Sequence, residues 1–320
     1  MVEPVSEVVI KAENLSKRFG KLLAVAGANL EVKRGEIFGL LGPDGAGKTT
    51  TIRMLATVMT PSGGHVTIAG LDATRYAETI KQRIGYMSQQ FNLYADLSVQ
   101  ENLDFFADIF AVRGRVRQER LEWLLHFARL TEFRKRRAGH LSGGMKKKLA
   151  LTCALVHKPE ILYLDEPTTG VDPVSRREFW DILSALHLEG VTIMVSTPYM
   201  DEAERCSRIG LMYRGRLVAC GTPAEVKKLV AEELIEVHPL VVRGLANIRR
   251  AEAVLAGVPG VLAVRTYGDL LRVFVDDAKA RLPQVRTALE GQGIAVVGLR
   301  PTQARMEEAF ISVVQRQTDK

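Results

Sequence analysis

The stretch GPDGAGKTT, residues 42–50, combines the residue types that bind a polyphosphate. Its glycines let the backbone wrap around phosphate oxygens with the N–H groups pointing inward, and the following helix N-terminus adds partial positive charge. Lys48 can reach the β- and γ-phosphates, and the Thr49 hydroxyl can ligate Mg²⁺. A strand pattern precedes the stretch and a helix pattern follows it, as this motif requires. The predicted nucleotide contacts are Gly42, Pro43, Asp44, Gly45, Ala46, Gly47, Lys48, Thr49 and Thr50.

A pair of acidic residues supplies a second set of chemically useful groups. The segment ILYLDEP, residues 161–167, is an apolar strand that ends in Asp165 and Glu166. Asp165 can hold Mg²⁺ directly or through water, and Glu166 can polarise an attacking water as a general base. The phosphate-binding loop earlier in the chain is the reason to expect that this pair acts on a bound nucleotide.

A third segment, LSGGM at residues 141–145, opens a predicted helix. Ser142, Gly143 and Gly144 offer a hydroxyl and bare N–H groups at the helix N-terminus, which is again an arrangement that binds anions. The segment matches the signature motif of ABC-type ATPases, and the chain resembles that family over about residues 8–225.

This resemblance implies further site residues and a dimer. In the family, the signature motif binds the γ-phosphate held by the other subunit, so two subunits join head to tail with two ATPs between them. The Q-loop, YMSQQFNLY, contains Gln89, which should contact Mg²⁺ and the attacking water. The D-loop, TTGVDP, places Asp172 at the subunit interface, and KRFG places Phe19 where the family stacks an aromatic ring on adenine.

The details of these motifs look closest to ATPase subunits of ABC-2-type exporters, including multidrug efflux systems. The segments in question are GPDGAGKTT, LSGGMKKKLAL and GVDPVSRREFW. The resemblance implies three things: an integral-membrane permease of the ABC-2 type as partner, a second ATPase subunit (identical or related), and a peripheral location on the cytoplasmic face of the cell membrane.

The first 225 residues show an α/β pattern. Residues 36–42, 161–165 and 191–196 are almost entirely apolar, which is typical of parallel strands buried on both faces. Helical patterns lie between them. We therefore expect a P-loop NTPase domain of ABC type over residues 1–225, with a helical subdomain at about 90–160.

Residues 226–320 change rhythm and predict a separate small domain. The order βαββαβ is typical of a ferredoxin-like α+β fold, and no catalytic constellation is found there. The expected strands are 234–242, 261–267, 270–275 and 293–299, and the expected helices are 246–256, 278–291 and 303–315. In the exporter group, such an appendage often ends in a segment like ARMEEAFISVV.

The composition is that of a globular protein: 320 residues, of which 47% are hydrophobic and 25% are charged. The net charge is +7, and the three cysteines lack CxxC spacing, which favours reduced thiols. We find no signal peptide and no apolar run of the roughly 18 residues that a membrane helix needs. The basic segments FRKRRAG and KKK have few aromatic neighbours, so we expect solvated faces or a lipid-facing surface and no nucleic acid.

A helical segment at residues 98–112 carries an apolar stripe of Leu103, Phe106, Ala107 and Phe110. The simplest interpretation is packing inside the helical subdomain. In the family, a groove beside the Q-loop receives a helix of the permease, and residues 91–94 are the expected contact.

The sequence departs from the family at Pro198, in the stretch GVTIMVSTPYMDEAERC. The family has a histidine here that contacts the γ-phosphate, and proline has neither a side-chain donor nor a backbone N–H. Proline suits the first position of a helix, so Ser196 or Thr197 is expected to cap a helix that begins with Asp201 and Glu202 in its opening turn.

Three functions stay open at this point. The first is an ATPase that powers a membrane exporter. The second is a soluble ABC ATPase acting on ribosomes or DNA, which the single phosphate loop and the lack of heptads disfavour. The third is a low-turnover regulatory subunit, which only Pro198 supports. Its phosphate site could be slow, dead, or fully active with another group, such as the Tyr199 hydroxyl, in place of the histidine.

Overall fold

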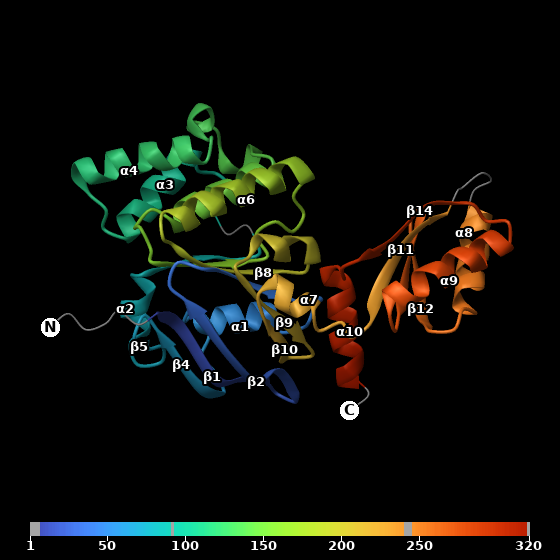
Figure 1. Ribbon diagram of the computed structural model, residues 1–320. Helices are drawn as coiled ribbons and strands as arrows, with labels where there is room; N and C mark the ends of the chain where they lie inside the picture. The colour runs from blue at the N-terminus through green and yellow to red at the C-terminus, as the bar shows by residue number, and fades with distance from the viewer. Residues whose placement is uncertain (1–6, 91–92, 240–244, 319–320) are drawn as a thin grey trace. The chain divides into compact units, whose positions relative to one another are not determined.

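The computed structural model describes residues 7–90, 93–239 and 245–318. The chain divides into two compact units, Met1–Pro223 and Ala224–Lys320 (Figure 1). None of the helices in the described part of the chain is both long and apolar enough to cross a membrane.

A six-stranded sheet forms the centre of the first unit. Its strand order is β10-β9-β3-β8-β7-β6, with every neighbouring pair parallel except β9 and β10. All side chains of β3, β7 and β8 are buried, which explains why these strands are apolar in sequence. The strands are β3 (Ile37–Leu41), β6 (Ile84–Met87), β7 (Ile161–Asp165), β8 (Thr192–Thr197), β9 (Arg208–Tyr213) and β10 (Arg216–Gly221).

The register of this sheet brings three strand ends to one edge. Leu41 pairs with Thr197 across β3 and β8, and Asp165 pairs with Ser196 across β7 and β8. Because parallel strands share a direction, the segments that follow them leave the sheet side by side. The phosphate-binding loop, the acidic pair and the segment containing Pro198 are therefore neighbours.

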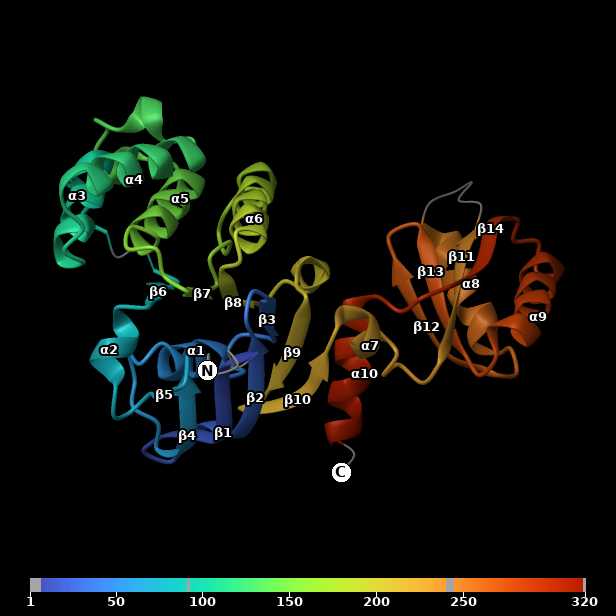
Figure 2. The same cartoon turned by 60° about the vertical axis from the view of Figure 1, so that its left-hand side comes forward.

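A second, antiparallel sheet covers the other side of α1 (Lys48–Leu55). Its strand order is β2-β1-β4-β5, and Figure 2 shows α1 between the two sheets. Ile52 and Leu55 of α1 are fully buried in a core that includes residues of both sheets, such as Val32 and Tyr163. The remaining elements of this layer are β1 (Val8–Phe19), β2 (Leu22–Lys33), β4 (Gly63–Ile68), β5 (Leu71–Asp72) and α2 (Ala77–Lys81).

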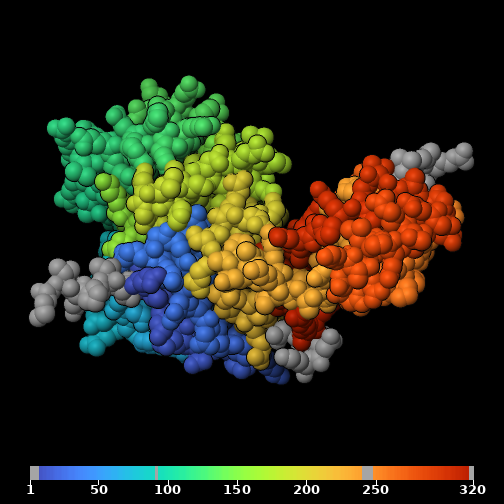
Figure 3. Space-filling view, in the orientation of Figure 1, coloured from blue at the N-terminus to red at the C-terminus, as the bar shows by residue number. Residues whose placement is uncertain are grey.

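Helices of the first unit gather in a lobe beside the six-stranded sheet, drawn in green in Figures 1 and 3. Ser98 and Glu101 form a capping box that starts the first of these helices. The lobe consists of α3 (Val99–Ile109), α4 (Gly114–Phe127), α5 (Gly143–Ala154) and the 3₁₀ helices Thr131–Phe133 and Ala138–His140. Another helix, α6 (Pro173–Leu188), follows the D-loop.

The prediction of a helix directly after β8 is wrong, because the structure has a 3₁₀ helix at Met200–Arg205 instead. Neither expected residue caps it. The Thr197 hydroxyl accepts the N–H of Tyr199 at 3.0 Å, which forms a local turn around Pro198. The Ser196 hydroxyl donates to Asp165 on the neighbouring strand, so tertiary contacts take the group that would have capped a helix.

After the short helix α7, which spans the boundary between the units, the second unit has the order βαββαβ that the sequence pattern predicts, followed by one more helix. Its sheet is antiparallel throughout, with the order β12-β13-β11-β14. Ile235, Val273, Leu255 and Leu289 are fully buried in its core. The elements are α7 (Pro223–Lys227), β11 (Glu233–Pro239), α8 (Leu245–Ala256), β12 (Val261–Tyr267), β13 (Leu270–Val275), α9 (Ala278–Gly291), β14 (Val296–Thr302) and α10 (Met306–Thr318).

The last expected strand and the last expected helix of this unit are each displaced by three residues at both ends, since they span 296–302 and 306–318. The last strand begins at 296 rather than 293, because the N–H groups of Gly293 and Ile294 still bond to the last carbonyls of α9. The final helix begins at 306 rather than 303, where the Glu308 carboxylate accepts the N–H of Arg305 at 2.7 Å. Of the expected strand 234–242, residues 240–242 lie outside the described residues.

The same carboxylate forms the most deeply buried ion pair of the second unit's described residues. Glu308 Oε1 lies 2.8 Å from Arg272 Nε, and the two side chains are 0% and 2% exposed. Arg272 also donates to the carbonyl of Gln303. The start of α10 is thus attached to β13 by a charge pair that is shielded from water.

We expect Glu308→Leu to lower the free energy of unfolding of the second unit by about 3–5 kcal/mol, because it leaves the Arg272 guanidinium buried without a counter-charge. Hydrogen exchange of the β11 and β13 amides during denaturant titration would measure this loss. The double variant Arg272→Met/Glu308→Leu is the matched control and should recover most of it. A double variant as unstable as the single would contradict this account.

Candidate active site

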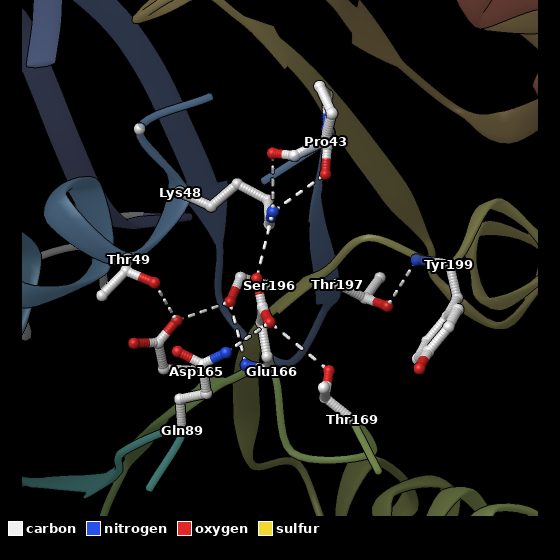
Figure 4. A network of polar contacts seen from close by, with 12 residues as sticks. Pro43, Lys48, Thr49, Gln89, Asp165, Glu166, Thr169, Ser196, Thr197 and Tyr199 are labelled. Atoms are coloured by element: carbon white, nitrogen blue, oxygen red, sulfur yellow. Dashed lines mark hydrogen bonds and ion pairs between the residues drawn. The ribbon is translucent and has the colours of Figure 1, made fainter. Parts of the chain in front are cut away.

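Functional groups from several segments meet at the shared strand edge of the first unit (Figure 4). The first turn of α1, directly after the phosphate-binding loop, supplies Lys48 and Thr49, while β7 ends in Asp165 and Glu166 follows it. The structure therefore brings together the two motifs that sequence separates by more than a hundred residues.

Two glycines of the phosphate-binding loop have no room for a side chain. A Cβ on Gly42 would lie 2.3 Å from the carbonyl oxygen of Met212, and one on Gly47 would lie 2.6 Å from that of Ala24. Gly47 also has φ 103°, a left-handed conformation that favours glycine. The close approach of β2 and β9 thus fixes the shape of the loop.

Lys48 lies inside this loop and is only 3% exposed. Its ammonium donates to the carbonyls of Gly42 at 2.8 Å and Pro43 at 3.0 Å, and it lies 3.1 Å from Glu166 Oε1. A buried cation needs such partners to offset the loss of water. The Nζ atom is therefore held beside the acidic pair.

Asp165 is fully buried, and its two oxygens have different surroundings. Oδ1 accepts hydrogen bonds from Thr49 Oγ1 and Ser196 Oγ, both at 2.9 Å. Among the described residues, no donor reaches the buried Oδ2. Burial raises the pKa of this carboxyl, and the hydrogen bonds from Ser196 and Thr49 oppose the rise.

An unsatisfied carboxylate oxygen beside a threonine hydroxyl fits a magnesium ion. Mg²⁺ prefers oxygen ligands and is commonly held by one or two carboxylates together with substrate phosphates. No cluster of three or more His, Cys, Asp or Glu side chains suited to a metal occurs in the described part of the chain. The oxygen ligands that Asp165 and Thr49 offer thus match an ion that is also bound by phosphate better than a metal held by protein ligands alone.

Glu166 is 5% exposed and accepts contacts on both carboxylate oxygens. Oε2 receives Gln89 Nε2 at 2.8 Å and Thr169 Oγ1 at 3.4 Å, while Oε1 faces Lys48. Its backbone has φ 46°, which is uncommon outside glycine and carries strain. The Glu166 N–H donates to Ser196 Oγ at 3.0 Å, which helps to hold this conformation.

Gly143 and Gly144 of the signature motif lie next to the D-loop and α6, and only Gly143 has space for a side chain. A Cβ on Gly144 would lie 2.5 Å from the Ser175 side chain, so this glycine permits close helix packing. The nearest atom to a Cβ on Gly143 is the carbonyl oxygen of Gly170 at 3.8 Å, which leaves ordinary space. Ser142 caps α5 by accepting the N–H of Met145 at 3.3 Å.

Two further residues implied by the family resemblance have clear local roles. Phe19 ends β1 and is 45% exposed, with Lys17 Nζ 5.4 Å from the ring centre. Asp172 caps α6 by accepting the N–H groups of Val174 and Ser175 at 3.1 and 2.9 Å. These hydrogen bonds, that from Ser175 foremost, lower the pKa of Asp172.

The sequence predicts a solvated or lipid-facing basic surface at KKK, residues 146–148. In the structure, two of these lysines instead contact groups of the protein. Lys147 donates to the carbonyl of Gln89 at 2.7 Å, and burial lowers its pKa against the opposing charges of Asp165 and Glu166. Lys148 is 7% exposed and pairs with Glu178. Only the helical spacing of the lysines hinted that they face different surroundings.

The sequence does not identify Ser196 and Thr169 as site residues and offers the Tyr199 hydroxyl as a candidate to replace the histidine. The contacts of Glu166 in Figure 4 run to Lys48, Gln89, Ser196 and Thr169. The Tyr199 ring instead lies 4.9 Å from the Arg176 guanidinium. Parallel pairing of strand ends was the available signal for Ser196.

A cavity of about 380 Å³ lies beside the Q-loop, between the sheet edge and the helical lobe. Of the apolar stripe predicted at residues 98–112, Leu103 and Ala107 are fully buried, while Phe106 and Phe110 line this cavity. Phe91 and Asn92, part of the expected contact at 91–94, lie outside the described residues. The rest of the lining is mainly apolar and includes Ile84, Tyr86, Leu93, Ile109, Ala150 and His157.

Comparison with known proteins gives relatives of one kind. A family profile described as "ABC transporter" matches residues 25–169. The chain is 46% identical over 227 residues to the probable multidrug ABC transporter ATP-binding protein YbhF of Escherichia coli (strain K12), covering 71% of this chain but 39% of that protein. It is 36% identical over 312 residues to the daunorubicin resistance ATP-binding protein DrrA2 of Streptomyces coeruleorubidus, covering 97% and 96%. The match to Nod factor export ATP-binding protein I of Rhizobium sp. (strain N33) is 36% over 318 residues, covering 98% and 100%.

Solved structures agree for the first unit. An ATP-binding subunit of an ABC transporter matches with a TM-score of 0.63 and 28% identity, covering 69% of this chain and 92% of that one. The cassette MJ0796, a dimer in a post-hydrolysis state bound to ADP and Pi, matches with a TM-score of 0.61 and 28% identity, covering 67% and 98%. The first unit has the P-loop NTPase fold of these cassettes, and the chain belongs to the family of ABC transporter ATP-binding proteins.

Proposed function

We propose that this chain binds and hydrolyses ATP as the energy-supplying subunit of a membrane exporter. The observation that carries the proposal is the meeting of Lys48, Thr49, Gln89, Asp165 and Glu166 at one edge of the sheet, joined by contacts of 2.8–3.1 Å. Phosphoryl transfer needs positioned positive charge, a metal ligand and a group that orients water, and this edge offers all three.

Each of these residues has a part in the proposed reaction. The loop amides and Lys48 bind the phosphates, and Phe19 stacks on the adenine. Glu166 orients the attacking water and accepts its proton, with Gln89 holding the carboxylate in place. Thr49, Asp165 and Gln89 are the proposed Mg²⁺ ligands, and the ion would neutralise charge that develops on the phosphates.

We further propose that two subunits complete each other's sites. Gly143 and Gly144 lie against the segment 170–175 of their own chain, and space remains open at Gly143. Backbone N–H groups at the start of α5 are suited to an anion brought by a partner. MJ0796, which shares the fold, is described as a dimer, which supports a head-to-tail dimer here.

The proposed membrane partner is a permease of the ABC-2 type, contacted from the cytoplasmic face of the membrane. The cavity beside the Q-loop is mainly apolar and is lined by Gln90. Gln90 is the neighbour of Gln89, which donates to Glu166, so a permease helix seated there would lie one residue from the active site. The names of relatives refer to multidrug transport, daunorubicin resistance and Nod factor export, which supports export as the process. Co-purification with a membrane permease would support this partner, whereas co-purification with ribosomes would favour the soluble alternative.

A second candidate function is a nucleotide-binding subunit with low turnover. Pro198 lies where the family has its γ-phosphate-contacting histidine, and Tyr199 contacts Arg176 instead of Glu166. We favour a site that hydrolyses ATP slowly, because the proposed base and the phosphate-binding groups are all present. One missing donor to a developing oxyanion costs about 10²–10³ in rate.

We expect Asp165→Asn to stabilise the protein at pH 7 without ligands while removing the stabilisation that Mg²⁺-ATP provides. The raised pKa of Asp165 means that its contribution to stability is greatest below the ordinary value of 3.8 and falls as pH rises through the folded pKa. The gain from asparagine should therefore vanish in acid. Thermal unfolding with and without Mg²⁺-ATP, across pH, would measure both effects.

Asp172→Asn is the matched control for this prediction. The pKa of Asp172 is lowered rather than raised, so its variant should lose a little stability at pH 7. If Mg²⁺-ATP stabilised Asp165→Asn as much as the natural protein, Asp165 would not be a metal ligand.

We expect Gly143→Asp to abolish turnover and leave folding and ATP affinity intact, because its carboxylate would face the phosphate held by the partner. Gly143→Ala fits the available space and should stay active. Steady-state hydrolysis should return when inactive Gly143→Asp chains are mixed with inactive Glu166→Gln chains, since the mixed dimer has one complete site. No recovery on mixing would contradict the head-to-tail arrangement.

We expect Pro198→His to raise the single-turnover rate by up to about 10²–10³-fold, because it adds a donor near the γ-phosphate. ATP affinity should hardly change, whereas Lys48→Ala should abolish binding. Rapid-quench measurements at saturating ATP would separate chemistry from binding. An unchanged rate in the histidine variant would mean that another group already fills this role.

A further inference from the structure

Glu202 is a buried carboxylate to which the proposed reaction gives no role. It lies in the 3₁₀ helix after Pro198 and is 2% exposed. Its Oε1 accepts a hydrogen bond from Thr168 Oγ1 at 2.8 Å, and no donor among the described residues reaches the buried Oε2. An acidic group held away from water with one oxygen unsatisfied is costly and calls for an explanation.

The donor of this hydrogen bond lies two residues after Glu166. Thr168 is 1% exposed, and its carbonyl accepts the N–H of Val171 at 3.2 Å. The Glu166 carbonyl in turn accepts the N–H of Thr169 at 3.3 Å. Residues 166–171 thus form a run of tight turns, and Glu202 holds the side chain in the middle of it.

The conformation of this run decides where the Glu166 carboxylate points. A residue with φ 46° that is not glycine keeps that conformation only when its surroundings impose it. On one side, Ser196 Oγ accepts the Glu166 N–H. On the other side, the Thr168 hydroxyl donates to Glu202 in a fully buried side-chain contact of the same turn.

Glu202 is itself held by its surroundings. Arg176 Nε lies 3.9 Å from its Oε1, and the same guanidinium pairs with Asp201 at 2.9 Å and faces the Tyr199 ring. The cation compensates part of the buried charge, so the carboxylate can stay in place. The 3₁₀ helix, α6 and the D-loop therefore meet at Glu202.

We propose that Glu202 is a positioning residue that acts through Thr168 to hold Glu166 in its strained, productive orientation. This inference rests on the proposed role of Glu166 as the base. It gives the segment after Pro198 a task that needs no histidine: the segment anchors the turn that carries the base. A misplacement of about 1 Å at such a group can cost about 10²-fold in rate.

Single-turnover hydrolysis, ATP affinity and thermal unfolding of four variants test the proposal. Glu202→Leu and Thr168→Val should each slow the chemical step about tenfold or more, with ATP affinity unchanged. The double variant should be no slower than the slower single, because both remove one hydrogen bond. Glu202→Gln should stay within about threefold of the natural rate, since its amide oxygen still accepts from Thr168.

Glu36→Leu is the matched control, because Glu36 is another buried carboxylate of the first unit and pairs with Arg208 away from the acidic pair. It should lower stability without slowing the chemical step of the folded fraction. The proposal is overturned if Thr168→Val keeps the natural rate, if the double variant multiplies the two losses, or if affinity and rate fall together. Full activity of Glu166→Gln would instead refute the base itself, while the Glu202 comparison would still report on the turn.

Discussion

Two adjacent carboxylates at the end of a buried strand are the constraint on which the active site depends. Asp165 and Glu166 are 0% and 5% exposed, and burying two negative charges side by side is unfavourable unless donors and cations surround them. The donors come from the phosphate-binding loop, the Q-loop, the D-loop and β8. Satisfying this pair therefore ties together segments that would otherwise be independent loops.

The two carboxylates are satisfied to different degrees, and the difference separates their chemistry. Glu166 is held on both oxygens, by Lys48 on one side and by Gln89 and Thr169 on the other. Asp165 is held on one oxygen and left open on the other. The contacts on both oxygens fix the orientation of the Glu166 carboxylate, whereas Oδ2 of Asp165, which no donor among the described residues reaches, leaves a position for a ligand. The different surroundings of the two residues are therefore consistent with the proposed roles of Glu166 as base and Asp165 as metal ligand.

Local sequence patterns predict the buried strands and the motifs of the site. They do not predict the contacts between segments that are distant in the chain. The all-apolar runs identified β3, β7 and β8 because both faces of a parallel sheet are covered. The helix expected after β8 failed because Ser196 donates to Asp165 on another strand, which no local pattern reveals. The prediction of a solvated or lipid-facing surface at KKK fails for Lys148 in the same way, because its side chain is buried against Glu178, a partner distant in the chain.

The glycines of the phosphate-binding loop are usually explained by the nucleotide, but here the protein's own backbone already excludes a side chain. The carbonyls of Met212 and Ala24 lie 2.3 and 2.6 Å from where a Cβ would be placed on Gly42 and Gly47. The turn after β9 strengthens this enclosure, because Gly215 donates its N–H to the carbonyl of Ala46 at 3.0 Å. Either glycine would be irreplaceable even in a chain that never bound a nucleotide. The loop therefore packs tightly against β2 and β9 in addition to enclosing phosphate. A shift of either strand would change the shape of the loop and so its contacts with a bound nucleotide.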